Sequence, residues 1–170
     1  MSIPYLAQQA DHQQLEWMGG GIMRVLLDTQ ATAGQLTVLR SHLPGGSASP
    51  VHVHSAEDEM FVLLRGDAVF WAGPRRYELS EGGVAFLPRN LPHAYRFVSD
   101  EVDLLTLCVP SGIEGFFRTA GRDLAKPKPE GWQLTPQTMA AAAVAFGQRI
   151  IGPPLDADAE MPATYLDSTR

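Results

Sequence analysis

Three histidines and one glutamate are the residues of this sequence whose types and spacing could do chemistry. His52 and His54 lie two residues apart in the segment PVHVHSAEDEMF. Alternate residues of a β-strand project from one face, so these two imidazoles would point at one centre. A turn after His54 could return the chain as a neighbouring strand with Glu59 facing that centre, and His93 follows a later Pro-flanked turn. Such a mixed nitrogen and oxygen set suits one divalent ion of Ni, Mn, Fe, Co, Cu or Zn.

The pair of histidines would be weak evidence alone, because histidines near turns are often only exposed polar residues. Here a Gly-rich turn precedes the pair, a carboxylate follows at a definite spacing, and a distant histidine opens another strand. Glu57 and Asp58 are also carboxylates close to the pair. We prefer Glu59 as the ligand because it opens the apolar run MFVLL, and we interpret Glu57 and Asp58 as a solvated acidic turn.

The elements that must position these residues are short β-type runs between residues 21 and 110. Runs such as GQLTVLRSH, EMFVLLRG and AYRFV alternate with turn segments such as PGGSASP, SEGG and PRNLP. Strands at regular spacing without intervening helices are typical of an antiparallel sandwich or barrel. The sequence therefore predicts an all-β fold for this part of the chain.

Aromatic side chains of these strands are candidate walls of a substrate pocket. If Glu59 points inward, strand alternation turns Phe61 inward as well, and an inward His93 brings Tyr95 and Phe97 with it. Phe86 shares one face with Val84 in the preceding run. Such a pocket suits a flat, largely apolar, oxygen-bearing ligand. The alternative is that these side chains simply fill the barrel. The expected substrate contacts are Phe61, Phe86, Tyr95 and Phe97.

Beyond Pro110 the sequence becomes helical in character. Ser111 and Glu114 have the spacing of a capping box ahead of an apolar segment. Thr135 followed by Pro136 has N-cap and first-turn character ahead of QTMAAAAVAF, and Gly147 is a plausible stop. We therefore expect two helices in this part of the chain.

The chain is expected to form one domain. Residues 1–152 would hold the barrel and its C-terminal helices, which occupy about residues 111–147 and pack on it. The polar and acidic tail, residues 153–170, is expected to be weakly ordered or to lie on a neighbouring subunit. We also expect a homodimer, because the chain outside the barrel could bury strand edges against a twin.

Composition argues against several classes of partner. The chain has 170 residues, a formal net charge of −6 and no lysine before Lys126. An acidic chain without a basic stripe is a poor candidate for binding nucleic acid or an anionic membrane. We expect neither a secretory signal nor a membrane span. The single cysteine, Cys108, lies in an apolar run and is expected to be a buried thiol. The expected location is the cytoplasm.

Two stretches resemble the sequence motifs of the cupin superfamily. The first has Gly46, five residues, the His-x-His pair, four residues, Glu59, six residues and Gly66. In the second stretch three residues fall at the family spacing: Gly82, Pro88 and His93. Two positions depart from the pattern, with Asn90 in place of Gly and Phe97 in place of Asn, and neither is a ligand position. The motif core spans residues 45–97.

This resemblance implies a double-stranded β-helix, the jelly-roll-like cupin barrel, with the metal inside. Its ligands would be His52, His54, Glu59 and His93. The surrounding sequence is similar to single-domain cupins of the quercetin 2,3-dioxygenase kind. That likeness implies a dioxygenase acting on a flavonol, phenolic or polyketide-like aromatic, with dioxygen as the second substrate.

In the scheme that the family implies, Glu59 is both ligand and general base. The flavonol hydroxyl gives its proton to this glutamate, and dioxygen then opens the central ring with loss of carbon monoxide. Two alternatives stay open, because one fold hosts many functions. One is a non-redox metal-dependent isomerase, cyclase or lyase, and the other is a non-catalytic cupin that binds a small molecule.

Overall fold

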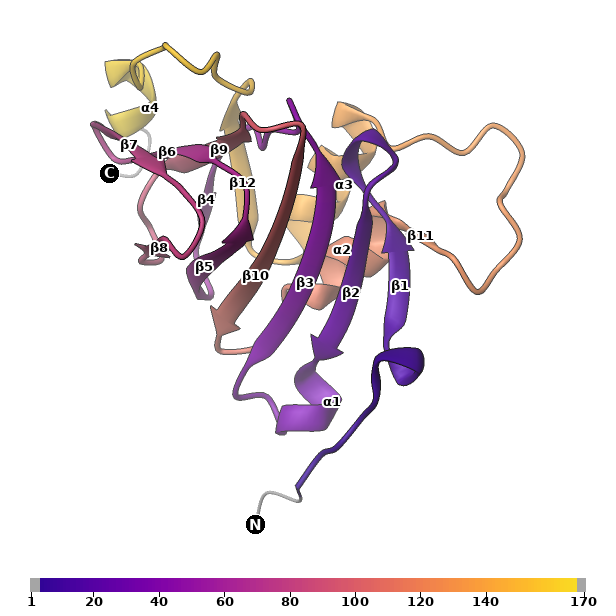
Figure 1. The fold of residues 1–170 in the computed structure, drawn as a ribbon. Coiled ribbons are helices and arrows are strands. Elements are labelled where there is room, and N and C mark those ends of the chain that lie inside the picture. Colours follow the sequence, from indigo (N-terminus) through magenta and orange to yellow (C-terminus); the bar gives the residue numbers. More distant parts are fainter. Residues whose placement is uncertain (1–3, 168–170) are drawn as a thin grey trace.

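The computed structural model describes residues 4–167, which are built mainly from two antiparallel β-sheets (Figure 1). The larger sheet has seven strands in the order β11 (Arg122–Asp123), β1 (Gln13–Glu16), β2 (Ile22–Leu27), β3 (Thr37–Pro44), β10 (Glu101–Val109), β5 (Asp58–Arg65) and β8 (Val84–Leu87). The smaller sheet has five strands in the order β12 (Gln148–Gly152), β4 (Val51–His54), β9 (His93–Phe97), β6 (Ala68–Ala72) and β7 (Arg75–Leu79). The prediction of an antiparallel sandwich or barrel is confirmed.

Short helices connect and flank the sheets. They are the 3₁₀ turns η1 (Gln9–Asp11) and η2 (Met18–Gly20) and the helices α1 (Thr29–Thr32), α2 (Glu114–Ala120), α3 (Pro136–Ala145) and α4 (Ala163–Leu166). Among residues 4–167, no helix has both the length and the apolar character that a membrane crossing requires. The cytoplasmic location stays a prediction.

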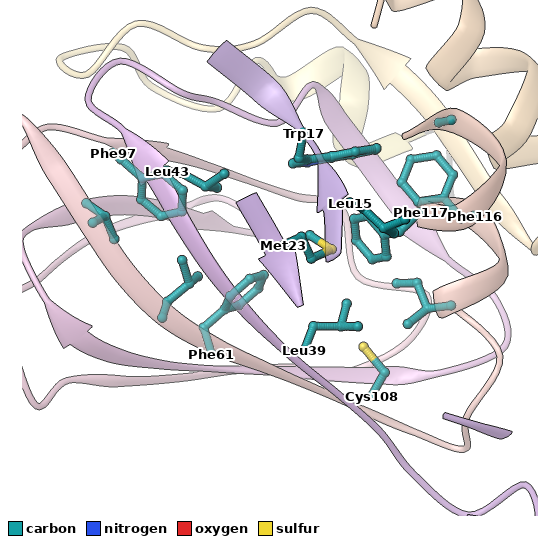
Figure 2. Close-up of a cluster of buried hydrophobic side chains, with 14 of the residues drawn as sticks. Leu15, Trp17, Met23, Leu39, Leu43, Phe61, Phe97, Cys108, Phe116 and Phe117 are labelled. Atoms are coloured by element: carbon teal, nitrogen blue, oxygen red, sulfur yellow. The ribbon is translucent and has the colours of Figure 1, made fainter. Parts of the chain in front are cut away.

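The main core lies on the inner face of the larger sheet. Strands β3 and β10 bury every second residue, as expected for strands with one face turned inward. Figure 2 shows Leu39, Leu43 and Phe61 in this cluster. Cys108 is completely buried among them and is a free thiol, which confirms its prediction. Phe116 and Phe117 of α2 extend the cluster, so α2 packs on this sheet.

The start signals of α3 are present as the sequence indicates. Thr135 is the N-cap, and its hydroxyl accepts a hydrogen bond from the Thr138 backbone N–H at 3.1 Å. Pro136 occupies the first turn, where its missing N–H has no cost. Beyond the helix, Gly147 adopts a positive φ of 71°, which a glycine tolerates readily.

The expected capping box of α2 is not formed. Ile113 is the N-cap, without a side-chain hydrogen bond. Glu114 turns inward and is buried, where its carboxylate accepts hydrogen bonds from the backbone N–H and hydroxyl of Thr29, the hydroxyl of Thr37 and the N–H of Gly112. The correction has a simple reason: these donors, 77 and 85 residues away in Thr37 and Thr29, outcompete a local cap.

The part of the tail that the structure describes is packed rather than weakly ordered. Leu155 and Met161 are each only 7% exposed and cover Trp71 and Val69 of β6. The Trp71 indole N–H donates to the Ala159 carbonyl at 2.8 Å. The outer face of β6 is apolar, and burying it offsets the cost of ordering this segment. Residues 168–170 of the predicted tail lie outside the described part.

Candidate metal centre

Both sheets contribute to one buried cluster of histidine and carboxylate side chains. His52 and His54 lie on β4, His93 opens β9 directly opposite His52, and Glu59 is the second residue of β5. Their exposed fractions are 8%, 2%, 1% and 4%. One potential ligand atom from each of the four lies within 4.8 Å of all the others. The structure therefore brings together all four residues that the sequence singled out.

Each imidazole is held in one orientation through its Nδ1 atom. The oxygen contacts are Pro50 O at 2.9 Å for His52, Leu91 O at 2.8 Å for His93 and Glu57 Oε1 at 2.6 Å for His54. A carbonyl or carboxylate oxygen only accepts, so Nδ1 must carry the proton and Nε2 is the atom left to coordinate. The Nε2 atoms of His54 and His93 are buried without a hydrogen-bond partner in the described residues, as is Glu59 Oε2. Unpaired buried atoms of this kind fit a bound cation.

The electrostatics of the cluster favour an ionised glutamate. Glu59 Oε2 lies 3.5 Å from His54 Nε2 and 3.3 Å from His93 Nε2. Burial by itself would raise the pKa of Glu59, but the His54 charge and the closeness of both imidazoles hold that pKa well below its usual range. Burial would likewise lower the pKa of His54, whereas the carboxylates of Glu59 and Glu57 raise it to about 9. A divalent cation at this centre would compete with the His54 proton.

His52 behaves differently from its neighbour on the same strand. Burial, followed by the charges of His93 and His54, lowers the pKa of His52 well below its usual value. His52 is therefore a neutral imidazole near neutral pH, ready to coordinate.

The interpretation of Glu57 as part of a solvated acidic turn is wrong. It is 4% exposed, and its carboxylate accepts the Nδ1–H of His54 instead of facing solvent. Asp58 does lie outside, where it forms an ion pair with Arg89 at 3.0 Å. Asp58 opens β5, whereas Glu57 lies in the segment between β4 and β5, where strand alternation does not assign the direction of a side chain. The spacing of three residues between His54 and Glu57 is the only local signal.

A small cavity of about 40 Å³ lies at the cluster. Tyr95, one of the predicted aromatic walls, lines it together with three cluster residues, His52, His54 and Glu59. Burial and the charge of Glu59 raise the pKa of Tyr95, so its phenol stays protonated near neutral pH. Phe61 and Phe97 are inward but sit behind Tyr95 in the core, with ring centroids 5.3 and 5.0 Å from its ring.

Phe86 is not a wall of this cavity. It is 59% exposed, on the outer face of the edge strand β8. Leu87, its neighbour, is the buried residue and lies opposite Glu59. The inward orientation predicted for Phe86 is therefore wrong. Leu87 points inward instead, because a shift of one residue along a strand exchanges its two faces.

Apart from Ser49 and Pro50, which directly precede His52, the remaining walls come from segments that the motifs do not include. They are Trp17 and Met18 near the N-terminus, Ser49 and Pro50, Ile113, Phe116 and Phe117 at α2, Met139 of α3, and Gln148 and Ile150 of β12. Figure 2 shows Trp17 beside Phe116 and Phe117. Nothing in the local sequence marks the residues outside the motifs as neighbours of the cluster.

The sequence and the fold are similar to those of known proteins. Residues 39–110 match the family model described as "Cupin domain". The chain is 29% identical over 120 residues to quercetin 2,3-dioxygenase of Bacillus subtilis, covering 71% of this chain and 35% of that protein. It is 23% identical over 125 residues to quercetin 2,3-dioxygenase of Aspergillus japonicus, covering 69% of this chain and 36% of that protein. The chain thus spans about a third of the length of these two relatives, since the matches cover 35% and 36% of them.

The solved structure of KdgF from Halomonas sp. has a similar fold. The TM-score is 0.57 at 14% identity, and the match covers 65% of this chain and 98% of that one. The four clustered residues all lie within the matched residues 39–110, whereas α2, α3 and β12 lie outside them.

Proposed function

We propose that this cupin superfamily protein, which resembles quercetinases, is a metal-dependent dioxygenase acting on a flavonol, phenolic or polyketide-like aromatic. The observation that carries the proposal is the buried set of three imidazole Nε2 atoms and one carboxylate. Each ring is fixed through Nδ1, so the donors are oriented before any ion binds.

The four residues fit a divalent transition metal. Metal–nitrogen and metal–oxygen bonds are about 2.1 Å, so ligands on opposite sides of one ion lie about 4 Å apart. A cluster whose ligand atoms are within 4.8 Å of one another needs little contraction to reach that geometry. Two buried carboxylates, Glu57 and Glu59, offset the charge of the ion in an apolar interior. The donor set suits Ni, Mn, Fe, Co, Cu or Zn.

When bound, the metal would supply a Lewis acid that stabilises an ionised substrate hydroxyl. Glu59 would accept the proton of that hydroxyl, because its carboxylate is ionised near neutral pH and lines the cavity with an Oε2 that has no hydrogen-bond partner among residues 4–167. Tyr95, still protonated near neutral pH, would keep its phenol beside the reacting atoms. Apolar side chains of Ile113, Phe116 and Met139 line the cavity and would exclude water.

A flavonol is too large for the cavity alone. About 40 Å³ is far below the roughly 300–1,000 Å³ of pockets that enclose drug-sized ligands. A second, mostly apolar groove of about 510 Å³ adjoins it between β12 and α3. The two spaces share Pro50, Met139 and Ile150 as walls. In the proposed complex, the reacting oxygen enters the cavity, the ring system occupies the groove, and these side chains move apart.

The test is to load the protein with Mn, Fe, Co or Ni in turn and add a flavonol in air. Oxygen uptake should accompany loss of the flavonol absorbance, with carbon monoxide as a product. The same protein carrying His52→Ala is the control and should show neither change. If no metal form consumes oxygen with any flavonol or related phenol, the dioxygenase proposal is wrong.

The small cavity favours a second candidate. A non-redox isomerase, cyclase or lyase with a compact substrate would need no groove, because only a few atoms must reach the metal. Turnover of a carbonyl or enol substrate under nitrogen, by a metal form that leaves flavonols untouched, would replace the dioxygenase proposal with this one.

A further inference from the structure

Gln148 places an unpaired amide beside the metal centre. It opens β12 and lies directly opposite His54 of β4 in the antiparallel register. Residues opposed in this way project from the same face of the sheet as close neighbours. Gln148 lines the cavity, is 7% exposed, and its Nε2 is buried without a hydrogen-bond partner in the described part of the chain.

Trp17, which also lines this cavity, carries a second unpaired donor. Its side chain is 3% exposed and packs edge-on against Phe116 and Phe117, with centroid distances of 5.6 and 4.9 Å. The indole Nε1 is buried and finds no partner among residues 4–167. An indole N–H can only donate, so it calls for an acceptor.

A metal ion does not account for these two groups. The unpaired Nε2 atoms of His54 and His93 and the unpaired Glu59 Oε2 are explained by coordination, because each offers a lone pair. Amide and indole N–H hydrogens are instead repelled by a cation. Buried donors are nearly always paired in native structures, so the missing partner is expected to come with a ligand.

We propose that Gln148 and Trp17 are substrate-binding residues that donate hydrogen bonds to the oxygen atoms of a ligand held at the metal. This inference rests on the metal binding in the proposed function. One cation and two N–H groups together call for several oxygen lone pairs. A ligand with two neighbouring oxygen atoms supplies them, and the flavonol of the proposed function, with its hydroxyl beside a carbonyl, is such a ligand. Both residues lie outside residues 39–110, so the selection belongs to the segments that surround the cupin motifs.

The binding test uses the Co(II) form under nitrogen, where no oxygenation can occur. 3-Hydroxychromone, which has the hydroxyl beside a carbonyl, is titrated while the visible Co(II) absorption is followed. Gln148→Leu and Trp17→Phe should each raise its Kd about tenfold, a cost of about 1.4 kcal/mol. The metal content should stay that of the parent. Arg149→Gln, on the exposed neighbouring position of β12, is the matched control and should bind as the parent does.

Phenol is the comparison ligand, because it has one oxygen for the metal and none left for the donors. Its Kd should change much less than that of 3-hydroxychromone in both variants. Equal affinity of parent, Gln148→Leu and Trp17→Phe for 3-hydroxychromone would overturn the proposal. Normal binding in the parent without oxygen consumption in air would count against the dioxygenase but leave these donors in place.

The thermal stability of the Gln148→Leu variant distinguishes a ligand-binding role of Gln148 from a structural one, because the two roles predict opposite changes in Tm. Replacing an unpaired buried amide by an apolar side chain removes a desolvation cost, so Gln148→Leu should keep or raise the Tm of the metal-free protein while ligand binding falls. A lower Tm together with loss of metal would mean that Gln148 supports the fold, and would refute its assignment to the ligand. Trp17→Phe keeps the aromatic packing and tests the other donor independently.

Discussion

Glu57→Ala is expected to weaken metal binding by about 10- to 100-fold, although Glu57 is not a ligand. In residues 4–167 the Glu57 carboxylate, 2.6 Å away, is the group that accepts the Nδ1–H of His54. A buried hydrogen bond to a charged group contributes about 1.5–3 kcal/mol, and water cannot easily replace a partner that is only 4% exposed. That free energy corresponds to about one to two powers of ten in affinity.

The assay is competition for Zn²⁺ against a chromophoric chelator near neutral pH. Glu57→Gln keeps an oxygen acceptor but removes the charge, so its loss of affinity should be intermediate. Asp58→Asn is the matched control, because Asp58 pairs with Arg89 on the outside of the molecule. Parent-like affinity in Glu57→Ala would refute the positioning role. A loss of the same size in Asp58→Asn would show that net charge, rather than the contact with His54, sets the affinity.

Four further predictions follow from the geometry. Alanine at any of the three clustered histidines should remove most bound metal, as measured by elemental analysis, while the circular dichroism spectrum stays that of the parent. The control variant His42→Ala, which changes a half-exposed side chain, should bind as much metal as the parent. Glu59→Gln should lower turnover more than metal content if Glu59 is the base, and unchanged turnover would leave it only a ligand. Glu114 is buried, which would raise its pKa, but hydrogen bonds from Thr29 and Thr37 hold that pKa below its usual value. The ionised Glu114 therefore stabilises the fold above its unfolded-state pKa, and this stabilisation is lost as the pH falls through its folded-state pKa. The Glu114→Gln variant should be about 1.5–3 kcal/mol less stable than the parent near neutral pH, and its stability should depend less on acid pH, as measured by urea unfolding. The expected homodimer should give twice the 18.5 kDa chain mass by light scattering, and Phe86→Glu on the exposed face of β8 should shift it towards one chain if that edge is the interface.

The sequence by itself determined the four candidate ligands and the class of fold. The His-x-His spacing places His52 and His54 on one strand face whatever the rest of the chain does, because alternation is a local property of a β-strand. The start of α3 was readable for the same reason, since Thr135 and Pro136 act on backbone groups within one turn. Strand existence also depends on local pattern, so the antiparallel architecture could be predicted.

Only the tertiary structure decided what surrounds those four candidate ligands. Gln148 meets His54 through pairing between strands 94 residues apart, and Trp17 reaches the cavity from the other end of the chain. Glu57 was hidden in a turn without periodicity, and Phe86 depended on the register of an edge strand. The tail packs because β6 presents an apolar outer face that no local pattern in residues 153–167 reveals. Alternation and caps are local and can be read from the chain, whereas the walls of this site are set by long-range packing, which decides what can reach the metal centre.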